Sequence, residues 1–254
     1  MKVVVVGGTG QIGRKLVKKL REDVFATVPA SLDDGVNTIT GEGLAAVVEN
    51  ASVVVDVSNS PSFEDGAALE FFDTSTRNIL EAETAAGVRH HVALSVVGAE
   101  RLADSGYLRA KLAQEKLIEG SPIPYSIVRA TQFLEFIGSI ADAASEGDKV
   151  RVAPVLIQPI AAEDVASALG EISLGPPVNG IVEVAGPEQF RFDELVRRWL
   201  DVRHDPREVI SDSHARYYGA ELQERTLLPG DEATLAETHF ERWLWKSEPG
   251  HSEN

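Results

Sequence analysis

Short apolar runs alternate along the first half of the chain with segments whose apolar residues recur at helical spacing. Val3–Val6 is a β-branched run, as expected of a strand that is buried on both faces. The runs predict strands at Val3–Val6, Val24–Val28, Val53–Val57, Val92–Leu94, Tyr125–Val128 and Ile181–Val184. Helical periodicity predicts helices at Gln11–Arg21, Leu44–Asn50, Phe63–Ala86, Tyr107–Glu119, Glu163–Leu174, Phe192–Val202 and Leu235–Trp245.

This alternation predicts βαβ units and an α/β fold of Rossmann type, with a parallel sheet and helices on both faces. We expect a single Rossmann-like unit over 1–254, with a cofactor-binding core at roughly 1–135 and a small C-terminal substrate-side subdomain at roughly 136–254. The polar tail from Glu248 is expected to fray. Ligands bind such sheets at the carboxyl ends of the strands. The segments expected to line the site are Gly7–Gly13, Pro29–Ser31, Ser58–Ser60, Ser95–Gly98 and Arg129–Phe133.

Charge and composition narrow the classes of function. The net charge is −16, from 40 acidic and 24 basic residues, and a field of that sign repels phosphate backbones. We therefore expect no nucleic-acid partner, although backbone N–H groups at a helix start can still bind an anionic cofactor. The chain has no cysteine, which excludes disulfides and thiolate chemistry. No apolar run is long enough for a membrane span and no signal-peptide pattern is present, so we expect a cytoplasmic protein without a membrane partner. Its expected partner is a small-molecule substrate, and a homo-oligomer is left open.

Three glycines recur at every third position where the first predicted strand meets the first predicted helix. Gly7 permits the tight turn, Gly10 lets the backbone approach a pyrophosphate, and Gly13 lets the helix pack closely on the sheet. A glycine pattern alone also fits a plain turn, but here a strand precedes it and an amphipathic helix follows, as a dinucleotide motif requires. No Gly-Lys-Ser/Thr follows, which excludes a P-loop. The turn is therefore predicted to bind the phosphates of a dinucleotide, and no metal is expected.

The end of the second predicted strand bears on the choice between NAD and NADP. Proteins that bind NAD usually place Asp or Glu there, where it bonds the ribose hydroxyls. This chain has Val28–Ser31 instead, and its first acids are Asp33 and Asp34. No arginine clamp stands there either, but Ser31 and Arg14 could hold a phosphate, which is tolerated better where no carboxylate repels it. The sequence therefore favours NADP(H) over NAD(H) and leaves NAD(H) open.

Three residues suggest a hydride-transfer site. Tyr107 and Lys111 lie four apart in a predicted helix and share a face, and Ser95 ends the preceding strand at the cofactor edge of the sheet. A lysine ammonium near a tyrosine lowers the tyrosine pKa toward the range useful for proton transfer. The Ser95 hydroxyl can orient a substrate carbonyl, and Lys111 can reach the cofactor ribose. The alternative is that Tyr107 caps a loop and that Lys111 is an ordinary solvated helix residue.

Five blocks of sequence follow one another in a characteristic order. They are VVVVGGTGQIG near the start, HVALSVVGAERLADSGYLRAKLAQEKLI (His91–Ile118), YSIVRATQFLEFI (Tyr125–Ile137), QPIAAEDVASAL (Gln158–Leu169) and VAGPEQFRFDELV (Val184–Val196). Together they resemble the short-chain dehydrogenase/reductase superfamily, and specifically its atypical, NmrA-like branch of NAD(P)-binding proteins. The resemblance covers nearly the whole chain to about residue 200.

The resemblance implies roles for further residues. Around the cofactor, the phosphate site with its glycines would be lined by Thr9, Gln11 and Ile12, the adenine would be approached by Glu42, and the rest of the cofactor would lie beside Ser58 and Asn59. The catalytic set would be Ser95, Tyr107 and Lys111. Phe133 would flank the nicotinamide or the substrate.

The resemblance leaves two classes of function. Some members are NAD(P)H-dependent reductases of small carbonyl, quinone or conjugated compounds. Others bind the dinucleotide without turnover and act as redox sensors that bind a protein partner, and these commonly lack the catalytic tyrosine. Because Tyr107 and Lys111 are both present, an oxidoreductase with Tyr107 as proton donor is favoured, and the sensor is the alternative.

The remaining polar and aromatic residues are interpreted as structural. His90 and His91 are adjacent on a predicted strand and point to opposite faces, so they cannot easily share a metal and are expected at the surface. Asp56 lies in an apolar run and is expected to bond a neighbouring turn rather than to act in catalysis. For the C-terminal aromatic residues, packing in the core or a subunit interface is favoured, and an aromatic-lined pocket is the alternative; they are Trp199, Trp243, Trp245, Tyr217 and Tyr218.

Overall fold

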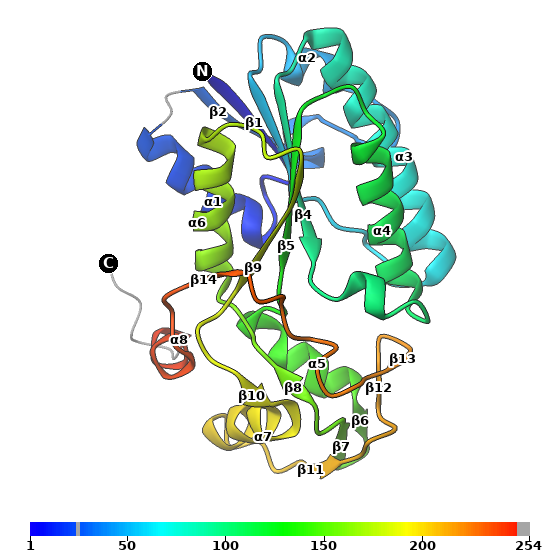
Figure 1. Ribbon diagram of the computed structural model, residues 1–254, viewed down its shortest axis with the longest axis vertical. Coiled ribbons are helices and arrows are strands. Elements are labelled where there is room, and N and C mark those ends of the chain that lie inside the picture. Colours follow the sequence, from blue (N-terminus) through cyan, green and yellow to red (C-terminus); the bar gives the residue numbers. More distant parts are fainter. Residues whose placement is uncertain (24–25, 248–254) are drawn as a thin grey trace.

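A parallel sheet of seven strands forms the centre of the protein in the computed structural model, which describes residues 1–23 and 26–247 (Figure 1). Its strands are β1 (Lys2–Val6), β2 (Ala26–Ala30), β3 (Val53–Asp56), β4 (His90–Val96), β5 (Tyr125–Ala130), β9 (Gly180–Ala185) and β14 (Thr234–Leu235). The order across the sheet is β14-β9-β5-β4-β3-β1-β2, and every neighbouring pair is parallel. The predicted Rossmann-type fold is confirmed.

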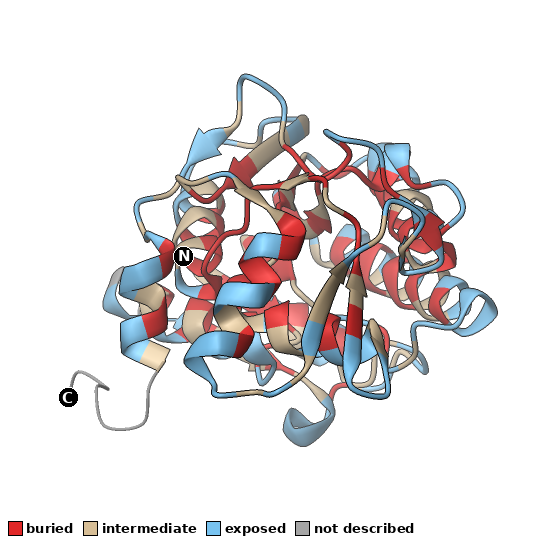
Figure 2. Ribbon diagram, turned by 90° about the horizontal axis from the view of Figure 1, so that it is seen from below, coloured by how far each residue is buried: buried red, intermediate tan, exposed pale blue. Residues whose placement is uncertain are grey.

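Helices cover both faces of this sheet. One layer holds α1 (Gln11–Asp23) and α6 (Ala162–Leu174), and the other holds α2 (Leu44–Val48), α3 (Asp65–Ala86) and α4 (Gly106–Glu119) (Figure 1). Leu16 of α1 and Leu169 of α6 are fully buried in one apolar cluster against the strands, and Ile79 of α3 is fully buried in another. Figure 2 shows this arrangement from below, with buried residues on the strands and inner helix faces and exposed residues outside.

A smaller substructure lies beyond the carboxyl ends of the sheet strands (Figure 1). Its elements are α5 (Ile137–Ala143), α7 (Phe192–Val202), α8 (Phe240–Ser247), and the short strands β6 (Ser145–Glu146), β7 (Lys149–Val152), β8 (Leu156–Ile157), β10 (Phe190–Arg191), β11 (Glu208–Ser211), β12 (Arg216–Tyr217) and β13 (Ala220–Glu221). The proposed boundary near residue 135 does not separate this substructure from the sheet, because α6, β9 and β14 all follow it in sequence yet belong to the central layers.

The structure corrects two expectations about individual segments. His90 and His91 are not at the surface: both are buried, because β4 is a central strand that is covered on both faces. The last helix begins at Phe240 rather than at Leu235, which instead pairs with Ala185 at the sheet edge. The first two residues of the predicted strand Val24–Val28 and the predicted frayed tail lie outside the described residues.

Candidate active site

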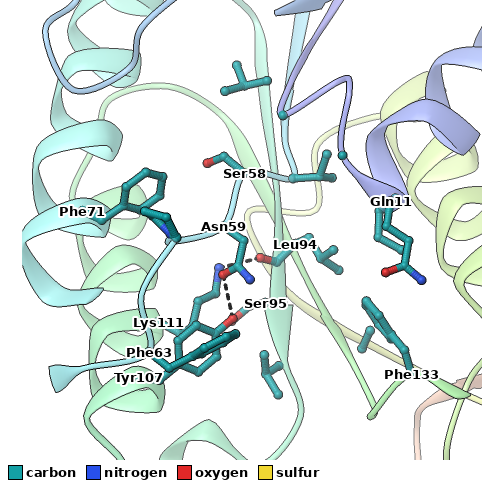
Figure 3. Close-up of a pocket in the computed structure, with 18 of the residues that line it drawn as sticks. Gln11, Ser58, Asn59, Phe63, Phe71, Leu94, Ser95, Tyr107, Lys111 and Phe133 are labelled. Atoms are coloured by element: carbon teal, nitrogen blue, oxygen red, sulfur yellow. Dashed lines mark hydrogen bonds between the residues drawn. The ribbon is translucent and has the colours of Figure 1, made fainter. Parts of the chain in front are cut away.

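A cavity of about 840 Å³ opens at the carboxyl ends of the sheet strands. Its wall takes residues from the loops that follow β1, β2, β3 and β5 and from the last residues of β4, at the edge that the sequence predicted. The predicted site residues in its lining are Gly7, Thr9, Gly10, Gln11, Ile12, Ser31, Ser58, Asn59, Ser95, Tyr107, Lys111 and Phe133. Figure 3 shows Asn59, Tyr107 and Lys111 on one side of the cavity, with Gln11 and Phe133 across from them.

The glycine turn packs too closely for side chains. Gly7 has a left-handed backbone with φ 77°, and a Cβ there would lie 2.9 Å from the Ser58 backbone. A Cβ on Gly13 would lie 2.1 Å from the Gly7 carbonyl oxygen, so Gly13 serves helix packing and does not line the cavity. The first backbone N–H groups of α1, which begins at Gln11, have no acceptor within the helix. They form an anion-binding end of the kind that holds a pyrophosphate.

Unpaired polar atoms in the wall fit a polar ligand. Ser58 Oγ, Thr131 Oγ1 and both side-chain polar atoms of Gln132 are buried without a hydrogen-bond partner among the described residues. All three residues line the cavity. Buried polar groups are normally satisfied by a partner. Together with the glycine turn, they show that this wall suits a large polar ligand such as a dinucleotide.

The loop after β2 brings its acidic side chains closer to Ser31 than the sequence suggested. Residues 32–34 form a single 3₁₀ turn that returns the chain to Ser31, whose hydroxyl donates to Asp34 Oδ2 at 2.6 Å. Asp33 lines the cavity, whereas Arg14 lies outside it in a separate shallow hollow. Asp34 therefore lies beside Ser31, and the preference for NADP(H) over NAD(H) stays a prediction. Glu42, the proposed adenine neighbour, is exposed and outside the cavity lining.

Tyr107 is held by Asn59 rather than by Lys111. Its hydroxyl donates to Asn59 Oδ1 at 3.0 Å, and its ring lies 5.0 Å from the ring of Phe63 and 6.2 Å from that of Tyr218. Burial raises the pKa of Tyr107 well above its usual range, and the nearby Tyr218 hydroxyl adds to the rise. The expected lowering of this pKa by the lysine does not occur, because the Lys111 ammonium is directed elsewhere.

Lys111 is buried beside the carboxyl end of the central strand β4 and is not a solvated helix residue. Its ammonium donates to the Leu94 carbonyl oxygen at 2.8 Å and to Gln114 Oε1, and it lies 4.4 Å from the centre of the Phe72 ring. Burial lowers the pKa of Lys111 to about 8, although the Asp56 and Glu115 carboxylates oppose that change. The lysine is therefore still mostly protonated at neutral pH.

Asp56 has the structural role that the sequence suggested, together with a second one. Its Oδ1 accepts the backbone N–H of Ser58 at 2.9 Å, which confirms the predicted bond to a neighbouring turn. Its Oδ2 accepts from Gln114 Nε2 at 3.0 Å, so Gln114 connects the carboxylate to the ammonium of Lys111.

Ser95 is paired away from the cavity interior. Its hydroxyl donates to Glu115 Oε1 at 2.5 Å, and both oxygens of Glu115 also accept from the Arg129 guanidinium, at 2.9 and 2.6 Å. A hydroxyl that already donates its proton has none to offer a substrate carbonyl. The orienting role expected for Ser95 therefore does not match its hydrogen bonds, although the residue does contribute to the cavity lining.

Aromatic side chains form the substrate-side wall, and most of them were not predicted there. Phe133 stacks on Phe136 with ring centres 5.3 Å apart, and both line the cavity. Tyr217 and Tyr218 line it as well, so for these two residues the less favoured alternative of an aromatic-lined pocket holds. Phe63 completes this wall from the loop after β3. Trp199 and Trp243 pack against the core of the smaller substructure as expected, whereas Trp245 is half exposed.

The described residues contain neither a metal-binding cluster nor a membrane-spanning helix. No group of three or more His, Asp and Glu side chains could hold a metal within that part of the chain. None of its helices combines the length and apolar character that crossing a bilayer requires.

Comparison with known proteins identifies relatives of this chain. A family model described as NAD(P)H-binding matches residues 7–173, which include the glycine turn, Tyr107 and Lys111. The photosystem II assembly factor Ycf39 of Synechocystis sp. is 26% identical over 156 residues, which are 56% of this chain and 48% of that protein. The chain therefore spans about half the length of the curated relative that it matches.

Solved structures share the fold at low identity. MoeE5, in complex with UDP-glucose and NAD, aligns with a TM-score of 0.69 and 17% identity, over 94% of this chain and 95% of that one. The Citrobacter sp. triphenylmethane reductase, complexed with NADP(H), aligns with a TM-score of 0.66 and 19% identity, over 84% of this chain and 80% of that one. One of these neighbours was solved with NAD and the other with NADP(H), so the shared fold does not decide between the cofactors.

Proposed function

The chain belongs to the NAD(P)H-binding family, and from this premise we propose that it is an NAD(P)H-dependent reductase of a small carbonyl, quinone or other conjugated compound. The observation that carries the proposal is that Tyr107 and Lys111 share one cavity with the glycine turn. A proton donor and a dinucleotide site in the same wall are what a hydride-transfer reaction needs. Membership of the NmrA-like branch stays a prediction.

The proton is the part of the reaction that this chain supplies. A bound NAD(P)H would provide the hydride. Tyr107 is protonated at neutral pH, and because burial raises its pKa it would give its proton only to a strongly basic oxygen, such as the one that hydride transfer would leave on the substrate. When a substrate oxygen takes the place of Asn59 as acceptor, the proton passes from Tyr107 to that oxygen. Solvent then returns the proton to Tyr107. The Lys111 ammonium uses two of its three N–H groups on Leu94 and Gln114, and it would give the third to the cofactor ribose.

Ser95 acts indirectly in this proposal. Its hydrogen bond to Glu115 joins it to the Arg129 ion pair at the carboxyl end of β4 and β5. We assign it a positioning role there, and we keep the catalytic role for Tyr107 and Lys111.

The aromatic wall favours a flat, conjugated acceptor. Phe133 and Phe136 form one side of the substrate region, and Phe63 and Tyr218 form another. Aromatic rings bind planar conjugated molecules through stacking and edge contacts. The structurally similar triphenylmethane reductase is named for a conjugated substrate, which agrees with this choice.

The test is turnover on an acceptor panel with a Tyr107→Phe variant. Purified protein is mixed with NADH or NADPH and with an aliphatic ketone, an aryl ketone, an enone, a quinone or a triarylmethane dye, and oxidation of the nicotinamide is followed by absorbance. We expect turnover on at least one conjugated acceptor, and a loss of about 100-fold or more in Tyr107→Phe because the proton donor is removed. Tyr125→Phe, at the far end of β5, is the matched control and should behave as wild type. Equal turnover in Tyr107→Phe would refute the assignment.

One observation favours the alternative of a sensor that binds a dinucleotide without turnover. The rings of Phe63 and Tyr218 lie beside the Tyr107 ring, 5.0 and 6.2 Å from it, and the Tyr107 hydroxyl already donates to Asn59, so the proton donor is engaged within the protein. A sensor would bind the cofactor, oxidise none of it with any acceptor, and capture a protein partner only when the cofactor is present. Turnover that depends on Tyr107 would exclude this alternative.

A further inference from the structure

We infer that the acceptor carries an uncharged apolar arm, which leaves the cavity across the exposed rings of Phe63, Phe136 and Tyr218. The inference deepens the proposed function, because it names a class of acceptor. It rests on that proposal in placing the reacting carbonyl of the acceptor beside Tyr107. It concerns binding, so it can be tested without turnover.

Three aromatic side chains at the substrate end of the cavity keep much of their surface in water. Phe63 is 51% exposed, Tyr218 is 41% exposed and Phe136 is 39% exposed, although all three line the cavity. Large apolar side chains are mostly buried in folded proteins, and a group of them left exposed around a cavity marks a binding surface. These rings can therefore contact a ligand that extends beyond the cavity.

The three rings stand around the proposed proton donor. The centre of the Phe63 ring lies 5.0 Å from that of Tyr107 and 5.6 Å from that of Tyr218, and the Tyr107 and Tyr218 rings are 6.2 Å apart. Phe136 stacks on Phe133, which lies across the cavity from Phe63 and Tyr107 (Figure 3). An acceptor whose oxygen takes the Tyr107 proton would therefore have these rings next to the rest of its body.

Tyr218 is held in place by a turn that does not favour a large side chain. Tyr218 and Gly219 form the two-residue turn of the hairpin β12–β13, with φ values of 47° and 87°. Such turns favour Asn, Asp or Gly, because a left-handed backbone crowds a larger residue. The Arg216 guanidinium donates to the Gly219 carbonyl oxygen at 2.9 Å and fixes the turn. A half-exposed ring at a strained position is the pattern of a ligand contact.

The charges in the cavity wall exclude an ionic arm. Among the lining residues that the structure describes, the charged ones are Asp33 and Lys111. Asp33 follows β2 on the dinucleotide side, and the Lys111 ammonium is bonded to Leu94 and Gln114. The substrate end of the lining therefore has no counter-ion for a charged arm, and moving an unpaired charge from water into such a wall is costly. The arm that fits is an alkyl chain.

The length of the arm should determine the affinity. Complete burial of one methylene group strengthens binding about fourfold. The rings would cover one side of an arm at the cavity opening, so about half of each methylene surface would leave water and the effect would be about twofold per methylene. The affinity should stop rising once the arm is longer than the rings can reach.

The experiment measures binding of phenyl n-alkyl ketones, with alkyl groups from methyl to heptyl, to the full chain with an excess of NAD⁺ or NADP⁺. Equilibrium dialysis gives each Kd, and a plot of its logarithm against arm length gives a slope for the arm and an intercept for the phenyl ketone. In wild type the Kd should fall about twofold per methylene over the shorter arms.

Two variants remove rings from the proposed path of the arm, and two are controls. Tyr218→Asn and Phe63→Ser should each flatten the slope. Tyr218→Phe keeps the ring and should keep the slope. Leu174→Ser removes an exposed side chain at the end of α6, outside the cavity lining, and should also keep it. Thermal unfolding reports whether each variant folds, and Phe63→Ser, in a loop, keeps the test decisive if Tyr218→Asn does not.

The outcomes separate this inference from the proposed function. A wild-type Kd that does not change with arm length would overturn the inference and would leave the exposed rings to a protein partner. An unchanged slope in both Tyr218→Asn and Phe63→Ser, or an equal loss of slope in Leu174→Ser, would overturn it too, since the arm would then bind elsewhere. The expected slopes without turnover of any acceptor would leave the arm site standing and would end the reductase proposal. Turnover that depends on Tyr107 but not on arm length would do the reverse.

Discussion

Replacing Lys111 by methionine should remove a pH-dependent component of the folding stability. Burial lowers the pKa of this lysine from the usual 10.5 to about 8, so the unfolded chain binds the proton more tightly than the folded protein does. Below pH 8 the proton is bound in both states, and the protonated lysine costs the fold about 3 kcal/mol. As the pH rises from 8 toward 10.5, the folded protein loses this proton first and the cost disappears. Wild-type stability should therefore gain about 2 kcal/mol from this group between pH 7 and pH 9.5.

The assay is urea unfolding of wild type and Lys111→Met at several pH values in that interval, which ends below the range where ordinary tyrosines titrate. The free-energy difference between the two proteins should change by about 2 kcal/mol across the interval, with wild type gaining relative to the variant as the pH rises. Lys18→Met, at an exposed position on α1, is the matched control and should follow wild type. A constant difference between wild type and Lys111→Met would show that Lys111 is as well solvated in the fold as in the unfolded chain.

Three further changes have effects that follow from single contacts. Gly13→Ala forces a Cβ to within 2.1 Å of a backbone oxygen and should cost about 1–3 kcal/mol, with weaker dinucleotide binding; wild-type values in unfolding and calorimetry would contradict this. Glu83 and His91 form a fully buried ion pair at 2.8 Å. Glu83→Leu or His91→Leu alone should therefore lower the free energy of unfolding by about 3–5 kcal/mol. In a double-mutant cycle, the double variant should lose much less than the sum of the two single losses. Simple addition of the two losses would speak against the pairing. Ser95→Ala should lower kcat less than tenfold, since the hydroxyl is paired with a glutamate; a loss of about 100-fold would instead show direct contact with the substrate.

Local patterns in the sequence were sufficient to predict the strand, turn and helix on the cofactor side of the site. The run Val3–Val6, the glycine turn and the helix from Gln11 depend on neighbouring residues only, and the structure reproduces them within a residue or two. The alternation of strands and helices likewise determines which loops reach the cavity edge. These features could be predicted because strand and helix periodicities are short-range properties of the chain.

Contacts between distant segments could not be predicted in this way. Ser95 stands where a catalytic serine is expected, but its proton partner, Glu115, comes from a helix that packs beneath the strand. Tyr218 reaches Tyr107 from a hairpin more than a hundred residues later, and nothing in its local sequence marks it as part of the wall. The burial of His90 depends on the central position of β4, which is a property of the strand order. The return of Asp34 to Ser31 was not predicted either, although a glycine after two acids is a turn signal.

The pairing of α1 with α6 affects how the protein is made. Leu16 and Leu20 of α1 are buried together with Val165 and Leu169 of α6, so α1 leaves the ribosome before a partner that is encoded about 150 residues later. At ordinary rates of translation, that interval lasts roughly 10–30 s. During this time the apolar face of α1 can pack only on the strands already made, and the part that α6 will cover is a natural binding site for a chaperone. The order of synthesis thus makes the nascent chain most vulnerable to aggregation just before α6 emerges.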